Sequence, residues 1–298
     1  MIPQLSLVIV NYRSEDALAH CLRSIHVATS ESIEVIVVDN SPIGPEYRPA
    51  DGRSAGVVLK DSGLRGLYFP QRDNVGYTKA ANFGARHAHG RSLCFLNPDT
   101  VLGQHALDRL LDWVERHPRT VAGPREFDSP GRIVTTCFPF VTRRFLWGAN
   151  LLYKFPWPRP WHPFVSWLVP PFRYARQCRT TNLPNQVPVM SGSCLMMFMS
   201  VWQEVGEWHE GLTYFGLESE WFERARQFGV AGWYIPSATI DHEHALSIRR
   251  SAGWRIREEA DRNRRWYGRR FGWLTLAILL VILWLEERFR PRVKHPTP

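Results

Sequence analysis

Ser92-Leu93-Cys94-Phe95-Leu96-Asn97-Pro98-Asp99 is an uncharged, mostly apolar run that ends in a carboxylate. Such a run predicts a buried strand, with Asp99 just past its carboxyl end. The same pattern occurs earlier, where the apolar residues 35–38 lead into Asp39 and Asn40. Open α/β sheets bind ligands at the carboxyl ends of their strands. These two clusters of acid and amide therefore predict one enzyme site that holds a nucleotide and a divalent ion.

The first 125 residues alternate between apolar strand patterns and amphipathic helix patterns. The sequence predicts strands at 5–10, 33–38, 67–69 and 92–96, and helices at 15–27, 77–89 and 103–116. Residues 41–66 are rich in proline, glycine and charge, and they predict a long connection. Alternation of strands and helices predicts an α/β fold with a doubly wound, mostly parallel sheet flanked by helices.

The pattern changes after about residue 124. Residues 138–175 carry four tryptophans and seven prolines without a clear period, which predicts an aromatic, proline-rich insertion over the rim of the site. The alternative is that these tryptophans fill the domain's own core. Regular patterns resume at 187–199, followed by a helix at about 218–228 and a strand at 232–235. We therefore expect a domain at 1–248, comprising a nucleotide-binding part (1–125), a variable insertion (126–186) and an acceptor or catalytic part (187–248), and a helical tail at 249–298.

Composition indicates a globular protein of the cytoplasm. Hydrophobic residues make up 44% of the 298-residue chain, enough to bury a sizeable core. The five cysteines are odd in number and show no C-x-x-C spacing, which argues for a reducing compartment and against a disulfide framework or a zinc site. The N-terminus has no basic region before its first apolar strand, so a signal peptide is not expected.

The tail carries most of the net charge of +9: from Arg249 onward there are 12 arginines and one lysine against five acids. Within it, the 15 residues from Phe271 to Leu285 contain no charge, whereas a membrane span needs about 20. An apolar helix with cationic flanks predicts shallow insertion at the inner face of the cell membrane. A helix packed on the core and a true span are the alternatives. Nucleic-acid binding is not predicted, because the arginines flank an apolar block.

Polar residues at strand ends and helix starts form the candidate nucleotide site. Asn11 follows the first strand, and Asp39 with Asn40 follows the second, where they could read a base and a ribose. Asn74 and Gly76 precede a helix whose free N–H groups favour phosphate, and this helix carries the further candidates Lys79 and Asn82. Gly84, in the middle of that helix, predicts close packing against the sheet.

A metal ligand and a catalytic base are also expected. Asp99 offers a hard oxygen suited to Mg²⁺ or Mn²⁺. Because Asn97 stands where a second acid would strengthen the signal, His242 and His244 are the expected helpers; the alternative is that both are exposed loop residues. Glu218 and Glu220 open a helix, where one could abstract a proton and the other position an acceptor. Their alternative role is to complement the helix dipole.

The assembled motifs resemble the inverting glycosyltransferases of family two, with the GT-A fold, and most of all the rhamnosyltransferase-like branch. The order and spacing of the matching segments cover about residues 5–125 and 187–250. The segments are Val8–Tyr12, Val35–Ser41, Asn74–Gly84, Leu96–Asp99, Met190–Met196, Tyr214–Glu218, Arg224–Arg226 and Tyr234–His242.

This resemblance implies a role for each candidate residue. Asp39 would contact the base of a nucleotide-sugar donor, and Asp99 would contact the metal-bound diphosphate. Glu218 would be the base that deprotonates the acceptor, in place of the family's usual aspartate. The whole implied donor set is Asn11, Asp39, Asn40, Asn74, Gly76, Lys79, Asn82, Asn97 and Asp99. The implied acceptor set is Ser191, Gly192 and Trp221.

The implied reaction is a metal-dependent, inverting transfer of a sugar, with dTDP-rhamnose as the expected donor. The expected acceptor is a glycan or lipid-linked glycan of a cell-surface polysaccharide. Two alternatives stay open: the same chemistry with galactofuranose or N-acetylglucosamine, or a catalytically inactive, membrane-bound assembly partner. A dinucleotide oxidoreductase is disfavoured, because no G-x-G-x-x-G follows the first strand.

Overall fold

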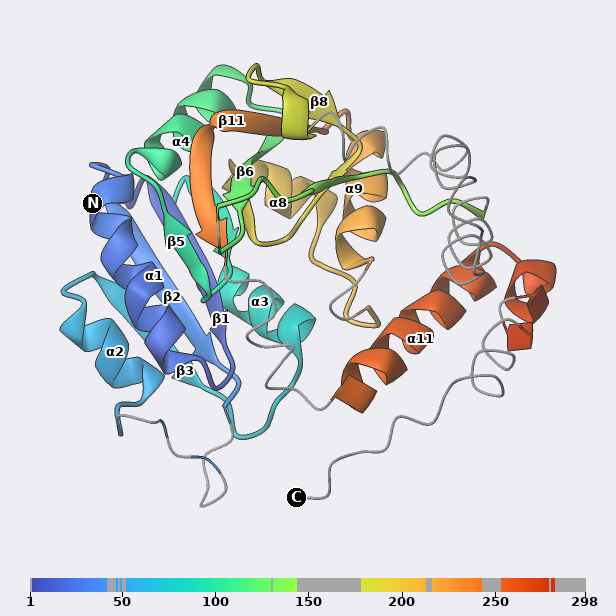
Figure 1. Cartoon of the computed structure of the whole chain (residues 1–298), viewed down its shortest axis with the longest axis horizontal. Coiled ribbons are helices and arrows are strands. Elements are labelled where there is room, and N and C mark those ends of the chain that lie inside the picture. Colours follow the sequence, from blue (N-terminus) through green and yellow to red (C-terminus); the bar gives the residue numbers. More distant parts are fainter. Residues whose placement is uncertain are drawn as a thin grey trace.

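A computed structural model describes residues 2–41, 47, 49, 52–129, 131–143, 178–212, 216–242, 253–278 and 280–281. Its centre is one mixed sheet with helices on both faces (Figure 1). The strands lie in the order β3-β2-β1-β4-β10-β6-β11-β5, and β8 pairs with β11. Their bounds are β1 Leu5–Asn11, β2 Ile33–Asp39, β3 Gly66–Pro70, β4 Ser92–Leu96, β5 Thr100–Leu102, β6 Thr120–Phe127, β8 Asn185–Val187, β10 Cys194–Phe198 and β11 Ala231–His242.

The parallel half of the sheet brings the predicted polar clusters to one edge. Strands β3, β2, β1 and β4 are mutually parallel, and the register pairs Asn11 directly with Asp39. Strand β10 then runs antiparallel to β4, while β6 and β11 are parallel to each other. The prediction of a mostly parallel, doubly wound sheet is therefore confirmed, and Asp39 and Asp99 lie at the same end of it.

Two hydrophobic clusters cover the two faces of the sheet, because alternate residues of each strand point in opposite directions. Along β1, Leu7 and Ile9 face one cluster, and Val8 and Val10 face the other. The first cluster lies under α1, α2 and α4, and the second under α3, α8 and α9. The helix bounds are α1 Glu15–Ala28, α2 Ala55–Asp61, α3 Tyr77–Arg86, α4 Ala106–Arg116, α8 Met199–Val205 and α9 Leu217–Gln227.

Helix α3 lies close against the sheet at Gly84, as expected from the sequence. A Cβ atom built on Gly84 would lie 2.6 Å from Cγ1 of Val8 and 3.1 Å from Cγ2 of Val38. Any larger side chain would force the helix away from β1 and β2. The glycine therefore sets the distance between α3 and the strands that carry the donor edge.

Several element boundaries differ from the sequence prediction. The connection at 41–66 contains α2, whose N-cap Ser54 accepts a hydrogen bond from the N–H of Val57. The last strand is longer than expected because β11 continues through an irregularity between Ile235 and Thr239, where its register with β6 shifts. This extension carries the chain from the far end of the sheet to His242.

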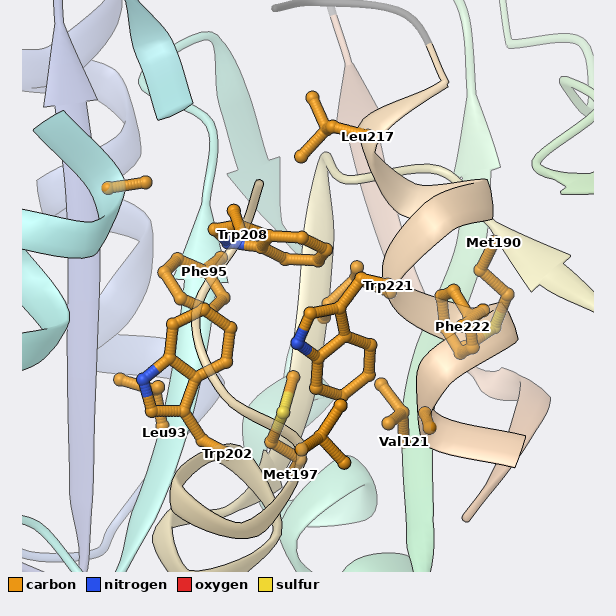
Figure 2. Packing of buried hydrophobic residues seen from close by; sticks show 14 of the residues in the cluster. Leu93, Phe95, Val121, Met190, Met197, Trp202, Trp208, Leu217, Trp221 and Phe222 are labelled. Carbon is orange, nitrogen blue, oxygen red and sulfur yellow. The ribbon is translucent and has the colours of Figure 1, made fainter. Parts of the chain in front are cut away.

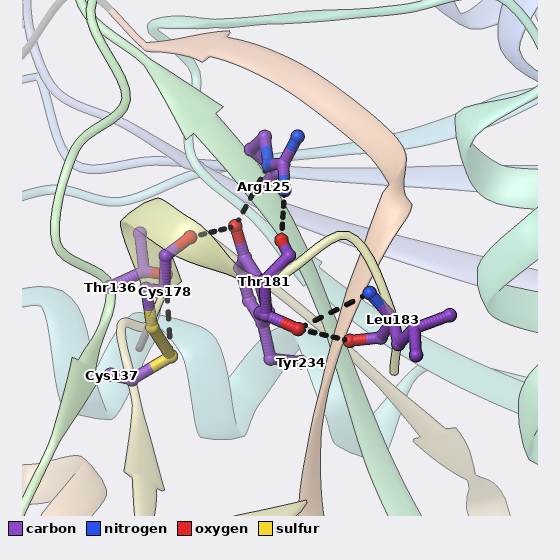
Figure 3. The surroundings of a disulfide bond; sticks show 7 residues. All are labelled: Arg125, Thr136, Cys137, Cys178, Thr181, Leu183 and Tyr234. Atoms are coloured by element: carbon purple, nitrogen blue, oxygen red, sulfur yellow. Dashed lines mark hydrogen bonds between the residues drawn. A yellow bond between two sulfur atoms is a disulfide. The ribbon is translucent and has the colours of Figure 1, made fainter. Parts of the chain in front are cut away.

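The prediction against a disulfide is wrong, because Cys137 and Cys178 form one (Figure 3). Cys137 lies in β7 (Cys137–Phe138), which pairs with β9 (Val189–Met190). The bond joins residues 41 positions apart, so sequence spacing gives no sign of it. Cys21, Cys94 and Cys194 are buried free thiols. The four tryptophans of the expected insertion lie outside the described residues.

Helix α11 (Gly253–Arg270) packs against the domain at its C-terminal end. Tyr267 is buried in the same cluster as α9, and Trp266 and Phe271 pack beside it. The residues that follow are different: 80% of Trp273 and 54% of Leu274 are exposed. A search of the described residues finds no helix with the length and hydropathy needed to cross a membrane.

Candidate active site

The donor edge is organised around the carboxylate of Asp39, at the end of β2. Its Oδ1 accepts hydrogen bonds from the Asn11 side-chain amide and the Ser41 backbone N–H, both at 3.0 Å. Its Oδ2 accepts one from the Tyr68 hydroxyl, also at 3.0 Å. Burial and the neighbouring charge of Asp39 raise the pKa of Tyr68, which keeps that phenol protonated. The carboxylate of Asp39 is therefore fixed in orientation, with hydrogen-bond donors on both oxygens.

A second group of donor candidates surrounds the start of α3. Gly76 is its N-cap, with a φ of +85° that favours glycine. The Gly76 N–H donates to Oδ1 of Asn74 at 2.9 Å, and its carbonyl accepts from the side-chain amide of Asn40 at 3.2 Å. Oδ1 of Asn40 is buried and accepts no hydrogen bond from the described residues. Lys79 is exposed on the outer side of this turn.

The structure does not support direct donor contacts for Asn82 and Asn11, because both side chains are buried and form hydrogen bonds within the protein. Asn82 is fully buried, and its amide forms hydrogen bonds of 2.9 and 3.0 Å with the backbone C=O and N–H of Trp208. Asn11 is also fully buried, and its amide bonds Asp39 and Glu15. Asn82 therefore joins α3 to the segment after α8, and Asn11 orients the carboxylate of Asp39.

At the end of β4, Asp99 meets His242 from the end of β11. Oδ1 of Asp99 lies 3.0 Å from Nε2 of His242, and Nδ2 of Asn97 lies 3.4 Å from the same ring nitrogen. Both Asp99 and His242 are 7% exposed. Asp99 and His242 are thus in contact, and their role as metal ligands stays a prediction. His244 lies outside the described residues.

Glu126 and Ser193 complete this cluster, and the sequence analysis missed both. Oε2 of Glu126 lies 3.1 Å from Nδ1 of His242, and the Ser193 hydroxyl donates to Oε1. Burial acts to lower the pKa of His242, but the hydrogen bonds to Asp99 and Glu126 outweigh it and raise the pKa to about 9. The sequence signal that could have indicated Glu126 is its place as the one acid in the run 120–127, which forms β6.

The donor set at Asp99 suits a hard divalent cation. A Mg²⁺ ion commonly uses one or two carboxylates together with substrate phosphates. The Glu126 carboxylate at Nδ1 of His242 is the type of contact that holds the other ring nitrogen ready for a metal. No cluster of three His, Cys, Asp or Glu residues within the described ranges is already placed to hold an ion. The residues therefore fit an ion that is shared with a bound diphosphate.

A cavity of about 480 Å³ opens beside Asp99 and His242. Its wall contains two further carboxylates, Asp128 and Asp241, and the imidazole of His20 from α1. The remaining lining residues are Ala17, Val101, Ser129 and Gly131. The negative charge of this wall favours a cation over a free anion.

Glu218 lies in the first turn of α9, against the backbone of Gly192. A Cβ atom built on Gly192 would lie 2.7 Å from Oε1 of Glu218, so only glycine leaves room for this carboxyl group. Burial raises the pKa of Glu218 to about 7, against the opposing effect of hydrogen bonds from the backbone N–H groups of Glu218 and Gly192. At neutral pH such a group can accept a proton and later release it.

Residues 191–193 connect Glu218 with the Asp99 cluster. The Ser191 N–H donates to the carbonyl of Thr136 at 2.8 Å, and the Ser193 carbonyl accepts from the N–H of Asn97 at 2.8 Å. Gly192 contacts Glu218, and the side chain of Ser193 binds Glu126. Ser191 and Gly192 are partly exposed, so their predicted place next to the reacting groups is consistent with the structure.

Two other predicted residues of α9 have structural roles, so their predictions are corrected. The indole of Trp221 is fully buried, donates to the Gly206 carbonyl at 2.7 Å and packs among the tryptophans of α8 and its following loop (Figure 2). It cannot contact an acceptor. Glu220 is 3% exposed and bonds Arg224 at 2.8 and 3.0 Å. That pair occupies both carboxylate oxygens, so Glu220 anchors α9 instead of sharing the catalysis.

The sequence model "Glycosyl transferase family 2" matches residues 6–206, about two thirds of the chain. The chain belongs to this family. The glycosyltransferase is 29% identical over 264 residues to "N-acetylglucosaminyl-diphospho-decaprenol L-rhamnosyltransferase" of Mycobacterium tuberculosis, a match that spans 83% of this chain and 78% of the relative. The prediction of a family-two, rhamnosyltransferase-like glycosyltransferase is therefore confirmed.

Solved structures confirm the GT-A-type fold of the glycosyltransferase. It aligns with GalNAc-T7, solved with UDP, GalNAc and Mn²⁺, at a TM-score of 0.57 and 17% identity, over 82% of this chain and 43% of the other. It aligns with the mannosyltransferase PcManGT from Pyrobaculum calidifontis, solved with GDP-Man and Mn²⁺, at a TM-score of 0.54 and 12% identity, over 98% and 77% of the two chains. At these identities the likeness concerns the fold alone.

Proposed function

We propose that the glycosyltransferase moves rhamnose from dTDP-rhamnose to a hydroxyl of a lipid-linked glycan, with inversion at the anomeric carbon. The observation that carries this proposal is that residues 191–193 lie between two groups of ionisable side chains and contact both. One is Glu218, a carboxyl group with a pKa of about 7, and the other is the cluster of Asp99, His242 and Glu126. The similarity to the mycobacterial rhamnosyltransferase supports the choice of sugar and of acceptor class.

Each end of the site has a separate task in the proposed reaction. On the donor side, Asp39 accepts an N–H of the base. Oδ1 of Asn40, which accepts no hydrogen bond from the described residues, binds a second polar group of the nucleoside. On the acceptor side, Glu218 takes the proton of the attacking hydroxyl. The hydroxyl oxygen then bonds to the anomeric carbon from the face opposite the leaving diphosphate. No covalent enzyme intermediate is needed, since one displacement inverts the configuration.

A divalent cation is part of the proposal. Asp99 and His242 would hold it, and a bound Mg²⁺ or Mn²⁺ supplies neutralisation of the charge that develops on the diphosphate. The Mn²⁺ present with GalNAc-T7 and with PcManGT supports this assignment. Glu126 keeps the ring of His242 in the orientation that faces Asp99.

A peripheral place at the inner face of the cell membrane fits a lipid-linked acceptor. Helix α11 ends in Arg269 and Arg270, and the exposed Trp273 and Leu274 follow directly. Cationic and aromatic side chains in this order suit the surface of an anionic bilayer. The assignment to the cytoplasm belongs to the proposal and rests on the expected cell-surface pathway.

The decisive test is transfer with a defined acceptor. We expect the purified protein to move rhamnose from dTDP-rhamnose to a short-chain polyprenyl diphosphate N-acetylglucosamine only when Mg²⁺ or Mn²⁺ is added. NMR should show an anomeric configuration opposite to that of the donor. Transfer of galactofuranose or N-acetylglucosamine from a UDP-sugar instead would show that the donor sugar is different, while the proposed inverting reaction would stand. Retained configuration, or transfer in the presence of a chelator, would contradict the proposal.

The glutamine variant of the base separates chemistry from binding. Glu218→Gln should lower kcat by about 10²–10⁴-fold, the range for losing a general base, while donor binding followed by thermal shift stays unchanged. Glu210→Gln is the matched control, because Glu210 is an exposed glutamate in the loop before α9. Equal activity of the two variants would place the base elsewhere, and no turnover by the unmodified protein with any donor would favour an inactive assembly partner.

A further inference from the structure

Helix α11 contacts the start of α9, the helix that carries Glu218. The hydroxyl of Tyr267 donates to the carbonyl of Gly216 at 2.5 Å. The ring of Tyr267 lies so close that a Cβ atom on Gly216 would be 2.9 Å from Cε2. Tyr267 is 2% exposed. Gly216 is the N-cap of α9 and stands two residues before Glu218, so this contact fixes the point where the catalytic helix begins.

The N-cap of α9 makes no side-chain hydrogen bond to the first turn, and that turn is held by contacts with other segments, among them the hydrogen bond of 2.8 Å from the Val141 N–H to the Ser219 hydroxyl. A polar side chain at the N-cap usually bonds a free N–H of the first turn and limits fraying. Gly216 has no such side chain, and its φ of +85° is a conformation that only glycine adopts readily. The hydroxyl and ring of Tyr267, which belong to α11, therefore help to hold this turn in place.

A second contact between the helices lies three residues further along α11. The Arg270 guanidinium lies 3.3 Å from Oε2 of Glu223 and 3.8 Å from Oε1 of Glu220. Glu220 in turn binds Arg224, which donates to the carbonyl of Val205 at 2.6 Å. Arg270 thus ties α11 to an ion-pair network that already joins α9 to α8.

Tyr267 also interacts with the next residues of α9. Burial raises the pKa of Tyr267, a hydrogen bond with Ser219 acts in the opposite direction, and the charges of Glu220 and Glu218 raise the pKa further. Burial and the charge of Glu218 raise the pKa of Tyr77, in the first turn of α3. Both phenols therefore stay neutral at physiological pH.

We propose that Tyr267 and Arg270 are positioning residues that hold the first turn of α9 and thereby keep Glu218 against Gly192. This inference rests on the proposed function, because it takes Glu218 as the base. It gives α11 a second task beyond membrane contact. Both Arg265 and Arg270 are exposed on this helix, but among the described residues only Arg270 of the two forms ion pairs with α9.

Substitutions on α11 test the inference in the full-length protein. Tyr267→Phe keeps the ring and removes the hydrogen bond to Gly216, and Arg270→Gln removes the contact with Glu220 and Glu223. Each should lower kcat for rhamnosyl transfer about tenfold, since a small misplacement of a catalytic group is costly. The KM for dTDP-rhamnose should change by less than about twofold, because the donor edge at Asp39 and Asp99 is not touched. A merely structural defect would lower the folded fraction and leave KM and kcat per folded molecule unchanged.

Arg265→Gln is the matched control, because it removes the same charge from an exposed position of the same helix that has no ion pair with α9 among the described residues. Its kcat should equal that of the unmodified protein. Losses of the same size in Arg265→Gln and Arg270→Gln would assign the effect to charge and overturn the positioning role. Unchanged kcat in both Tyr267→Phe and Arg270→Gln would overturn it as well.

Hydrogen–deuterium exchange gives a readout that does not need turnover. Amide exchange in a peptide covering residues 216–223 should be faster in Tyr267→Phe than in the unmodified protein, and unchanged in Arg265→Gln. If the unmodified protein transfers no sugar, the proposed function fails, while the exchange rates still test the contact between the helices. Equal exchange in all three proteins would then overturn the inference.

Discussion

Single side chains in this glycosyltransferase acquire their chemistry from their immediate surroundings. Glu218 and Glu220 are two residues apart on one helix, but their neighbours differ. Glu218 lies against the backbone of Gly192, whereas Glu220 pairs with a guanidinium. The pKa of Glu218 is raised to about 7 by burial, whereas Glu220 binds Arg224. The same principle separates Asn40, whose Oδ1 accepts no hydrogen bond from the part of the chain that the structure describes, from Asn82, whose amide oxygen and nitrogen both bond the backbone of Trp208.

The raised pKa of Glu218 predicts a stability that depends on pH. The folded state holds a proton on Glu218 up to about pH 7, whereas the unfolded chain loses it near pH 4.5. Stability contributed by this group therefore falls as pH rises from about 4.5 to 7, and the cost is fully present above pH 7. Glu218→Gln should accordingly raise Tm at pH 8 and have little effect near pH 4.5. A lower Tm at pH 8 would contradict the assignment.

Glu126 provides a residue-scale prediction for the proposed cation site. Without its carboxylate, the imidazole of His242 loses the hydrogen bond at Nδ1 that orients it. Glu126→Gln should raise the Kd for Mn²⁺ about 10–100-fold, the usual cost of losing such a contact. Titration calorimetry with Mn²⁺ and a nucleoside diphosphate measures it directly. Asp241→Asn is the control, because Asp241 lines the same cavity without a contact to His242, and an equal loss there would indicate a general effect of charge.

At the scale of elements, the polar groups at the sheet edge come together because α3 lies close to β1 and to β2, the strand that carries Asp39. Three features keep it there: Gly84 against the sheet, Asn82 bonded to the backbone of Trp208, and the hydroxyl of Thr78 bonded to the carbonyl of Leu212 at 2.5 Å. The latter two connect α3 with the segment between α8 and α9. The donor and acceptor sides of the site are therefore joined through one helix.

Gly84→Ala is predicted to destabilise the protein, although alanine is the better helix former by about 1 kcal/mol. The new methyl group would lie 2.6 Å from Cγ1 of Val8, far inside contact distance. Overpacking of this kind costs about 1–3 kcal/mol, so the net change should be a loss of stability. Urea denaturation measures the change. A more stable variant would show that α3 can move away from the sheet at little cost.

At the scale of the whole molecule, α11 leads from the core of the domain to a surface where apolar and basic side chains are exposed together. The C-terminal end of α11 packs beside α9 through Trp266 and Tyr267, and in the residues beyond it Trp273 and Leu274 are exposed. The exposed apolar residues stand next to arginines, so this end combines hydrophobic and electrostatic attraction to an anionic bilayer. Helix α11 thus connects the proposed base, on α9, with the proposed membrane contact.

The double variant Trp273→Ser/Leu274→Ser is predicted to weaken binding to vesicles that contain anionic lipid. Burying each apolar side chain contributes about 1.5–3 kcal/mol, so the partition coefficient should fall at least about tenfold. Co-sedimentation with vesicles of phosphatidylglycerol and phosphatidylcholine measures it. Val57→Ser, at an exposed valine of α2, serves as control. Unchanged sedimentation of the double variant would remove the membrane contact from these residues.

Local patterns were enough to predict the α/β class, the strands that end in Asp39 and Asp99, and the family. The reason is that buried strands and their terminal turns leave a short-range signal in hydrophobicity and in residue type. Gly84 is a further case, since a glycine inside a helix is costly unless something must lie close to it. Glu218 was found from its place at a helix start together with the resemblance.

The remaining features depend on residues brought together by the tertiary structure. Glu126 meets His242 across strands that are distant in the sequence, and Cys137 meets Cys178 across 41 positions. Trp221 and Asn82 looked like ligand contacts by sequence, but the packing of α3, α8 and α9 buries both. Whether a polar side chain is free for a ligand depends on its three-dimensional neighbours, and only the folded chain specifies these.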